Sequence, residues 1–376
     1  MGLHLRTGVA AGVAPWAAWR PSAPYTLGVE EEVMLLDPAT LELAQRGDEV
    51  LPRLGDGLAG RVSAETHQGA IELATAPHRT VGGAVAELRE LRELLAARLH
   101  ALGIAVAAAG THPTADRRDT VVSPASRYQL IHRTMRDLAR REPTFALHVH
   151  VGVPDAAAAM RLLNRLRAHL PLLLALSASS PFWQGRATGI ASSRTVIFQA
   201  FPRTGIPRRF DDYDDWAGTV DGLLRAEAIP EPTFLWWDVR PQPRFGTVEV
   251  RVMDSQPRLR DAASLVALVQ AVARLELEEG YASEALVAAQ EVLEENRFLA
   301  ARDGAAAELI DPVGGRRLPV RRLVAELVAA ARPHAEALGC AEELEGAARL
   351  DAATWQAQVG ARDGLPAVVR ELTRRF

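Results

Sequence analysis

Lysine is absent from this sequence, so all 43 of its basic residues are arginine. A P-loop lysine, a Schiff-base lysine and a Ser–Lys catalytic dyad are therefore excluded. Any phosphate group that the protein binds must be held by arginine side chains, backbone N–H groups or metal ions. The missing residue type thus narrows the kinds of phosphate site that this chain can build.

Cysteine, long apolar runs and excess positive charge are also scarce or missing. Cys340 is the single cysteine, which excludes an internal disulfide and fits a reducing compartment, so we expect a cytoplasmic protein. No stretch of about 18 apolar residues exists that could span a membrane. The formal net charge of −4 offers no broad basic surface for nucleic acid. We therefore expect small-molecule partners, with neither nucleic acid nor membrane among them, and leave the formation of a homo-oligomer open.

Two common sequence motifs of enzymes are missing as well. No Gly-x-Ser-x-Gly segment is present and Cys340 has no obvious partner, so a Ser or Cys nucleophile is not expected. No Gly-x-Gly-x-x-Gly segment follows a predicted strand, which leaves a dinucleotide-binding fold without support.

Hydrophobic periodicity predicts both strands and helices. Strands rich in Val, Ile and Leu are predicted over residues 25–36, 62–74, 104–109, 145–153, 234–239 and 247–253. Helices are predicted over residues 81–102, 124–140 and 156–176. Asp155 is a suitable N-cap for the last of these, and Pro171 should kink or divide it. After Asp261 the chain is almost wholly helical, with breaks expected near residues 311–315 and at Pro333.

The order of these elements favours an α+β fold. The strands come in separated pieces, and the helices between them are not regularly spaced, which favours a mostly antiparallel sheet with helices packed on its outside over a doubly wound parallel sheet. We expect a flexible leader over residues 1–24 and a single catalytic domain over residues 25–376. Within that domain, residues 25–304 carry the motifs and residues 305–376 form a helical tail. Residues 177–215 form a long connection, which is usually functional or ordered by a ligand.

Acidic side chains interrupt several of the predicted strands. Glu30 and Glu32 lie two residues apart and therefore face the same side of their strand. Glu72 and Glu249 lie inside two other Val- and Leu-rich strands, where an unpaired carboxylate is costly to bury. Convergence of these acids around cations explains the pattern better than separate solvated edges do. Oxygen ligands favour Mg²⁺ or Mn²⁺ over Zn²⁺.

His148 and His150 form another pair on one strand face. The spacing also resembles a zinc pair, but the lack of a usable cysteine and the many carboxylates favour a harder cation. Whether His150 is a ligand or a structural residue stays open.

Arginine and tryptophan residues add candidates for substrate binding. Arg251 shares a strand face with Glu249, where it either neutralises that acid or binds a phosphate or carboxylate of an anionic substrate. Arg194 and Arg240 are candidates for the same work, although a solvated role suits them equally. Trp237 is a candidate contact for substrate or ATP, and the Trp pair to which it belongs suits a core position as well.

A collinear set of segments resembles the bacterial carboxylate–amine ligase family, also called the type 2 glutamate–cysteine ligase family. The matching segments are, in order, Leu27–Glu32, Ile71–Pro77, Leu147–Gly152, Leu176–Phe182, Gly189–Arg194, Leu235–Pro241, Thr247–Asp254 and Glu295–Gly304. Together they cover roughly residues 25–304, and a set in this order is far more specific than any single motif.

The resemblance implies a glutamine-synthetase-like fold, in which antiparallel strands curve into a funnel lined by acidic metal ligands. The metal-ligand positions that it implies are Glu30, Glu32, Glu65, Glu72, His148 and Glu249. Arg251 and Arg194 would then face phosphate or the substrate carboxylate and take part in catalysis with Glu249.

The implied reaction activates a carboxylate with ATP, in the presence of Mg²⁺ or Mn²⁺, to an acyl phosphate that an amine attacks to form an amide. We expect the γ-carboxylate of glutamate and the amine of cysteine as substrates, and residues 177–215 as a lid that shields the acyl phosphate. Three alternatives are other acids and amines in specialised metabolism, phosphoryl transfer to a small guanido or amine acceptor, and a non-catalytic homologue that binds a nucleotide or metabolite.

Overall fold

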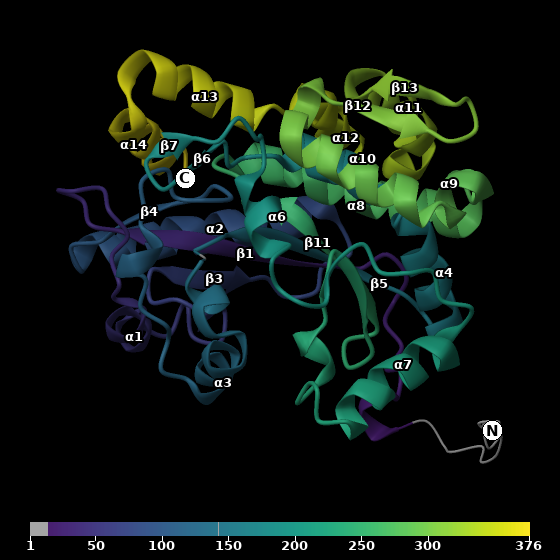
Figure 1. Ribbon diagram of the computed structural model, residues 1–376, viewed down its shortest axis with the longest axis horizontal. Helices are drawn as coiled ribbons and strands as arrows, with labels where there is room; N and C mark the ends of the chain where they lie inside the picture. The colour runs from purple at the N-terminus through teal and green to yellow at the C-terminus, as the bar shows by residue number, and fades with distance from the viewer. Residues whose placement is uncertain (1–13, 142) are drawn as a thin grey trace, which may run out of the picture.

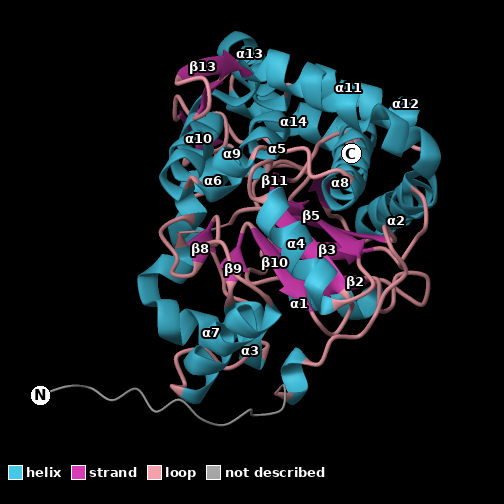
Figure 2. Ribbon diagram, turned by 90° about the vertical axis from the view of Figure 1, so that its right-hand side faces the viewer, coloured by secondary structure: helices cyan, strands magenta, loops and turns pink. Residues whose placement is uncertain are grey.

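The computed structural model describes residues 14–141 and 143–376. An antiparallel sheet lies at its centre, with helices around it (Figures 1 and 2), in the strand order β10-β11-β5-β1-β3-β2 with β4 paired to the far end of β1. Its strands are β1 (Leu27–Leu36), β2 (Val62–Ala64), β3 (Ala70–Ala74), β4 (Ala105–Ala107), β5 (Ala146–Gly152), β10 (Val239–Gln242) and β11 (Thr247–Asp254). Each pairing within this sheet is antiparallel, so the predicted α+β architecture with a mostly antiparallel sheet is confirmed.

One face of the sheet is apolar and packs against helices. Val29 and Val33 of β1 belong to this face and are buried, as is Val149 of β5. The helices that contact these strands are α2 (Val81–Ala101), α4 (Ala156–Leu166), α5 (Leu170–Ser177) and α8 (Leu259–Glu278). Because α8 also contacts α2, α4, α11 and α12, it is buried on nearly all sides. The alternation of side chains along each strand therefore leaves the opposite face free for polar residues.

The remaining elements flank this core. The helices are α1 (Gly47–Val50), α3 (Ser126–Met135), α6 (Ser193–Phe198), α7 (Tyr213–Arg225), α9 (Glu284–Ala288), α10 (Gln290–Asp303), α11 (Val320–Leu338), α12 (Ala341–Gly346), α13 (Ala352–Asp363) and α14 (Leu365–Arg375). The short strands are β6 (Phe182–Trp183), β7 (Arg186–Ala187), β8 (Thr204–Gly205), β9 (Trp236–Trp237), β12 (Glu308–Asp311) and β13 (Arg316–Pro319). Among the described residues, none of these helices combines the length and the apolar character that crossing a membrane requires.

The C-terminal helices complete the core on the polar side of β1. Met34 and Leu36 lie on the same face as Glu30 and Glu32 but belong to a second apolar cluster. Buried residues of α13 and α14, including Leu372, pack into this cluster, and α14 contacts β4. The tail thus covers one end of the polar face and leaves the acidic end open.

Of two predicted helix breaks, one is confirmed and the other is wrong. The helix predicted over residues 156–176 is divided as expected, with Pro171 in the first turn of α5 and Asp155 capping α4 by accepting from Ala158 N at 2.7 Å. The break predicted at Pro333 is wrong, because α11 continues through this proline. The packing of α11 against α8 and α12 outweighs the lost backbone hydrogen bond.

The predicted helical tail also contains a hairpin, and the predicted leader is partly packed. Residues 308–319 form β12 and β13, so the break expected near 311–315 is the turn of a hairpin. Within the predicted leader, Trp16 packs edge-on against Trp216 of α7 with ring centroids 5.6 Å apart. The rest of the predicted leader lies outside the described residues.

The middle residue of the Glu30-Glu31-Glu32 run lies on the helix side of β1. Glu31 is fully buried there, and Arg92 of α2 pairs with both of its carboxylate oxygens. Arg92 NH2 also donates to the carbonyl of Gln256 at 2.8 Å, which ties β1, α2 and the start of α8 together. Removing one partner of such a pair leaves the other charge buried without compensation.

We therefore expect Arg92→Ala to lower the free energy of unfolding by about 3–5 kcal/mol. Denaturant unfolding followed by circular dichroism would measure this. Arg46→Gln, which removes the exposed pair with Glu49, should leave stability almost unchanged. Equal losses in the two variants would contradict a special role for the buried pair.

Candidate active site

The polar face of the sheet gathers acids and imidazoles that are distant in the sequence. The strand register sets Glu30 opposite His148, Glu32 opposite Glu72, and Glu249 opposite His150. These side chains line a cavity of about 370 Å³. Residues from outside the sheet that complete its wall are Glu65, Thr66, His67, Arg127, Tyr128, Ile131, Thr144, Arg194, Phe198, Glu231, Thr233, Trp236 and Phe245.

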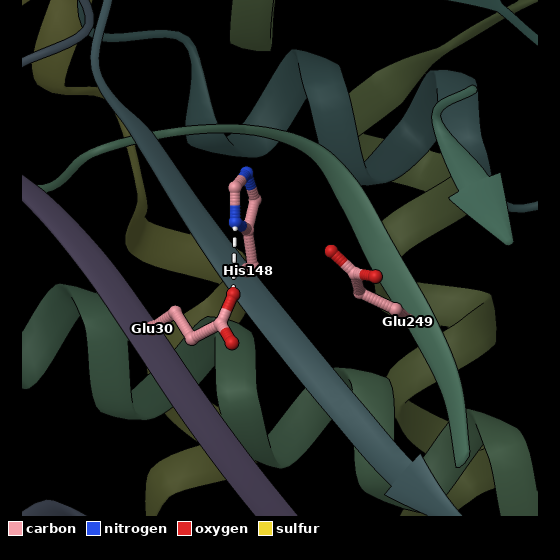
Figure 3. Close-up of side chains that lie close together, drawn as sticks. All are labelled: Glu30, His148 and Glu249. Carbon is pink, nitrogen blue, oxygen red and sulfur yellow. Dashed lines mark hydrogen bonds and ion pairs between the residues drawn. The ribbon is translucent and has the colours of Figure 1, made fainter. Parts of the chain in front are cut away.

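Two groups of three residues within this cavity could each hold a metal ion. Glu30, His148 and Glu249 form one group and come from β1, β5 and β11 (Figure 3). Glu32 and Glu72 form the second group with the same histidine. His148 Nδ1 lies 3.3 Å from Glu30 Oε2, whereas the buried Nε2 has no hydrogen-bond partner. This nitrogen is buried, is surrounded by carboxylates and has no hydrogen-bond partner, which fits the role of a metal ligand.

The electrostatics of the cluster also fit a divalent cation. Burial and repulsion from Glu30, Glu65 and Glu32 raise the pKa of Glu72 well above its ordinary value. Burial and the nearby Glu65 raise the pKa of Glu32 to about 8, against the opposing charges of Arg194 and Arg251. Carboxylates that resist ionisation in one another's company are stabilised by a cation between them, and oxygen-rich groups suit Mg²⁺ or Mn²⁺. The residues present therefore fit the implied metal.

The pKa values of Glu30 and Glu65 are shifted in opposite directions. Burial by itself would raise the pKa of Glu30, but the charges and hydrogen bonds of His150 and His148 hold it well below its usual range. Burial raises the pKa of Glu65, and Thr66 N donates to its Oε2 at 2.9 Å. Glu65 thus lines the same cavity as Glu32, although it belongs to neither group of three.

Glu249 is fully buried and already paired. Arg240 Nε donates to its Oε2 at 2.7 Å, Gln242 Nε2 donates to the same oxygen at 2.6 Å, and Arg251 pairs with Oε1. Although burial opposes it, Arg240 and Arg251 hold the pKa of Glu249 well below its ordinary value. The ion pair that the sequence left as one interpretation of Arg251 is present. A metal ion would have to share this carboxylate with the arginines.

Arg194 lies at the cavity wall, but its guanidinium donates hydrogen bonds to backbone carbonyls. Ser192 caps α6, and Arg194 in the first turn of that helix donates to the carbonyls of Val252 and Arg251, both at 3.1 Å. The pairing of β11 with β5 shifts register between Val250 and Met253, and these two carbonyls lie at that irregularity. Arg194 therefore supports the strand segment that carries Arg251.

Of the predicted site residues, Trp237 is the one that the structure does not bring to the cavity. Its ring packs against Phe210, with centroids 5.8 Å apart, while the neighbouring Trp236 lines the cavity. Adjacent residues of a strand point to opposite sides, so the two rings cannot share one environment.

His150 lies beside the metal groups rather than within them. Its Nδ1 shares a hydrogen bond of 2.9 Å with Thr247 Oγ1, and its Nε2 lies 3.4 Å from Glu30 Oε1. Burial lowers its pKa, but Glu30 and Glu249 more than offset this and raise it overall. The raised pKa suits a positively charged neighbour of Glu30, whereas the buried Nε2, which like that of His148 has no hydrogen-bond partner, would suit a further ligand of the ion.

Several cavity residues were missed by sequence reasoning. Gln242 follows Arg240 at the alternate position of β10, a spacing that could have revealed it. Arg127, Tyr128 and Glu231 carried no such signal, because they lie on a helix and a loop that only the tertiary fold brings to the sheet.

The sequence and the fold of this chain are similar to those of known proteins. Residues 26–358 match the profile of glutamate–cysteine ligase family 2. A Rubrobacter xylanophilus protein provisionally named glutamate–cysteine ligase 2-1 is 44% identical over 322 residues, which cover 86% of this chain and 85% of that protein. A Sorangium cellulosum protein provisionally named glutamate–cysteine ligase 2 is 42% identical over 330 residues, covering 87% and 88% of the two chains.

Solved structures share the fold at low sequence identity. The Francisella tularensis glutamate–cysteine ligase, solved in complex with AMP, superposes with a TM-score of 0.67 at 15% identity and covers 94% of this chain and 89% of its own. A bifunctional glutathione synthetase from Pasteurella multocida gives a TM-score of 0.60 at 14% identity over 93% of this chain and 49% of its own. The ligase fold that the family resemblance implied is therefore confirmed.

The raised pKa of Glu32 predicts a pH dependence of stability in the metal-free protein. The folded protein keeps a proton on Glu32 up to about pH 8, whereas the unfolded chain loses it near its ordinary pKa of 4.5. The stability that this group contributes is fully present below the lower value and is lost as pH rises through the higher one. Denaturant unfolding in a chelator, repeated from pH 5 to about pH 8, should show the decline.

Glu32→Gln should flatten that decline, and Mg²⁺ should stabilise the wild-type protein most strongly at the alkaline end. An unchanged slope in the variant would contradict the raised pKa.

Proposed function

We propose, from the premise that this chain belongs to glutamate–cysteine ligase family 2, that it joins the γ-carboxylate of glutamate to the amine of cysteine. As a member of that family the chain is an ATP-dependent carboxylate–amine ligase. The observation that carries the proposal is the convergence of six predicted metal-ligand side chains and four arginines in one cavity.

The proposed reaction has two steps. An oxygen of the substrate carboxylate attacks the terminal phosphorus of ATP, the bond to the bridging oxygen breaks, and ADP leaves. The amine nitrogen then attacks the acyl carbon, phosphate departs with the carboxylate oxygen, and the nitrogen loses a proton as the amide forms. The second step needs a site from which bulk water is kept out, because water would hydrolyse the acyl phosphate.

Metal binding at this site is part of the proposal. Glu30, His148 and Glu249 would hold one ion, and Glu32 and Glu72 would hold a second with the same histidine, while Glu65 lines the same cavity. A divalent ion supplies charge neutralisation for the phosphates and for the carboxylates around it. We take the nucleotide substrate to be ATP, because the Francisella tularensis ligase, which has the same fold, was solved in complex with AMP.

The arginines of the chain provide fixed positive charge near the transferring phosphoryl group. Arg251 uses one nitrogen for Glu249, and its other N–H groups remain available to a ligand in the cavity. Glu249 and the other acids raise the pKa of Arg251 despite its burial, so it stays charged. Arg240 holds Glu249 in place from the neighbouring strand, and Arg194 fixes the backbone at Arg251. Such preorganised charges stabilise a transition state without having to reorient.

The first half of the segment proposed as a lid, residues 177–215, is held in place by two hydrogen bonds. Ser180 Oγ and Ser192 Oγ both donate to the buried carboxylate of Asp254, at 2.7 and 2.9 Å. Arg194 also ties α6 to β11, so movement that covers the cavity would involve residues 199–212, between α6 and α7, rather than the whole 177–215 segment.

Replacing Glu249 with Gln should reduce amine-dependent ADP formation by at least about 10²-fold, because it removes a metal ligand and the partner of two arginines. A coupled ADP assay with glutamate, cysteine, ATP and Mg²⁺ would measure this, with thermal unfolding to confirm that the variant is folded. Glu87→Gln, which alters an ion pair with Arg61 outside the cavity, is the control and should retain activity. Full activity of Glu249→Gln would remove this residue from the site.

Analysis of the wild-type products separates ligation from phosphoryl transfer. A ligase releases free phosphate and an amide, whereas a kinase leaves a stable phosphorylated acceptor. ADP formed together with a phosphorylated amine would contradict the proposed function.

A further inference from the structure

An ion pair that the metal groups do not use lies at the cavity. Arg127, in the first turn of α3, pairs with Glu231, and its NH1 also donates to Thr233 Oγ1 at 3.0 Å. Thr233 Oγ1 in turn donates to Glu231 Oε1 at 2.6 Å. All three residues line the cavity, so they present one cationic and one anionic group to its contents.

This pair is much more accessible than the arginine pair at the cluster. The side chains of Arg127 and Glu231 are 37% and 48% exposed, whereas those of Arg240 and Glu249 are 10% and 1% exposed. An exposed pair contributes little to stability and can exchange partners, while separating a buried pair leaves a charge uncompensated. Arg127 and Glu231 are therefore free to accept a ligand's charges.

The surroundings of Arg127 favour a carboxylate. The guanidinium lies 4.7 Å from the centroid of the Phe234 ring, which restricts its plane. A guanidinium binds a carboxylate through two parallel hydrogen bonds, so Arg127 suits a carboxylate of a ligand in the cavity.

The pair is also joined to the metal cluster through a short chain of hydrogen bonds. The carbonyl of Thr233 accepts from Arg240 NH1 at 2.8 Å, and Arg240 Nε donates to Glu249. Burial raises the pKa of Glu65 at the cluster, and the charge of Arg127 opposes this rise. A ligand held by Arg127 and Glu231 would thus lie beside the acids that are proposed to bind metal.

We propose that Arg127 and Glu231 bind the α-carboxylate and the α-ammonium group of an amino-acid substrate. This inference rests on the proposed function and deepens it, because it assigns the residues that recognise the two α groups of the acid. The zwitterion supplies an anion for Arg127 and a cation for Glu231, so each side chain exchanges one opposite charge for another. With both α groups held there, the carboxylate that reaches the cluster is the one on the side chain.

Three acids test this assignment by deletion of one group at a time. Glutamate carries both α groups, glutarate lacks the ammonium group, and 4-aminobutyrate lacks the α-carboxylate. With ATP, Mg²⁺ and cysteine in excess, the wild-type protein should form ADP with a higher kcat/KM for glutamate than for either analogue. Arg127→Gln should reduce the ratio of kcat/KM for glutamate to kcat/KM for 4-aminobutyrate by about tenfold or more, because 4-aminobutyrate lacks the α-carboxylate that Arg127 would bind. The ratio of kcat/KM for glutamate to kcat/KM for glutarate should stay unchanged in this variant. Glu231→Gln should show the reverse, and KM for ATP should stay unchanged in both.

Arg117→Gln is the matched control, since its exposed pair with Asp137 lies outside the cavity, and it should change neither ratio. Unchanged ratios in Arg127→Gln and Glu231→Gln would overturn the assignment. An increase in KM for ATP in Arg127→Gln, without a change in acid preference, would assign this arginine to phosphate and overturn it as well.

Calorimetric titration of the same three acids gives the comparison without turnover. If glutamate binds more tightly than both analogues but yields no ADP, the result contradicts the proposed function and supports the assignment of Arg127 and Glu231. If glutamate binds no more tightly than the analogues, the result contradicts that assignment.

Discussion

The antiparallel register of β1 with β3 and β5 is the constraint on which the candidate active site depends. It sets Glu30 opposite His148 and Glu32 opposite Glu72 on one face of the sheet. A shift by a single residue would turn these acids toward the helices and turn Val33 toward the cavity. The apolar packing of β1 and β5 against α2 and α8 prevents that shift. The hydrophobic core thus determines where the charges of the site lie.

Placing so many acids together costs free energy, and the chain offsets this cost with arginine. A guanidinium offers five donors in a plane, whereas an ammonium group offers three around a point. Arg240 uses this geometry to hold Glu249 and two backbone carbonyls at once, and Arg92 does the same for Glu31 on the other side of the sheet. Glu32 and Glu72 keep raised pKa values because burial and the neighbouring carboxylates outweigh the charges of the arginines. That residual repulsion is what a divalent cation would relieve.

The sequence predicted the strands, the apolar stripes of the long helices and the shared faces of the acid pairs. It succeeded there because these features depend on periods of two and about 3.6 residues, which neighbours along the chain reveal. It failed at Pro333, where the packing of α11 against neighbouring helices overrides the local tendency. It also failed at Trp237, since an apolar aromatic pair does not show which ring faces a cavity and which faces Phe210.

The sequence by itself determined which side chains of each strand share a face, and hence that Glu30 with Glu32 and Glu249 with Arg251 would act together. Only the tertiary structure decided which strands lie side by side, and therefore that His148 lies between Glu30 and Glu249. It also decided that α3 and the segment before β9 bring Arg127 and Glu231 to the same cavity. The physical reason is that strand pairing and helix docking are set by the burial of apolar surface across the whole chain, which leaves no periodic trace in the residues that line the site.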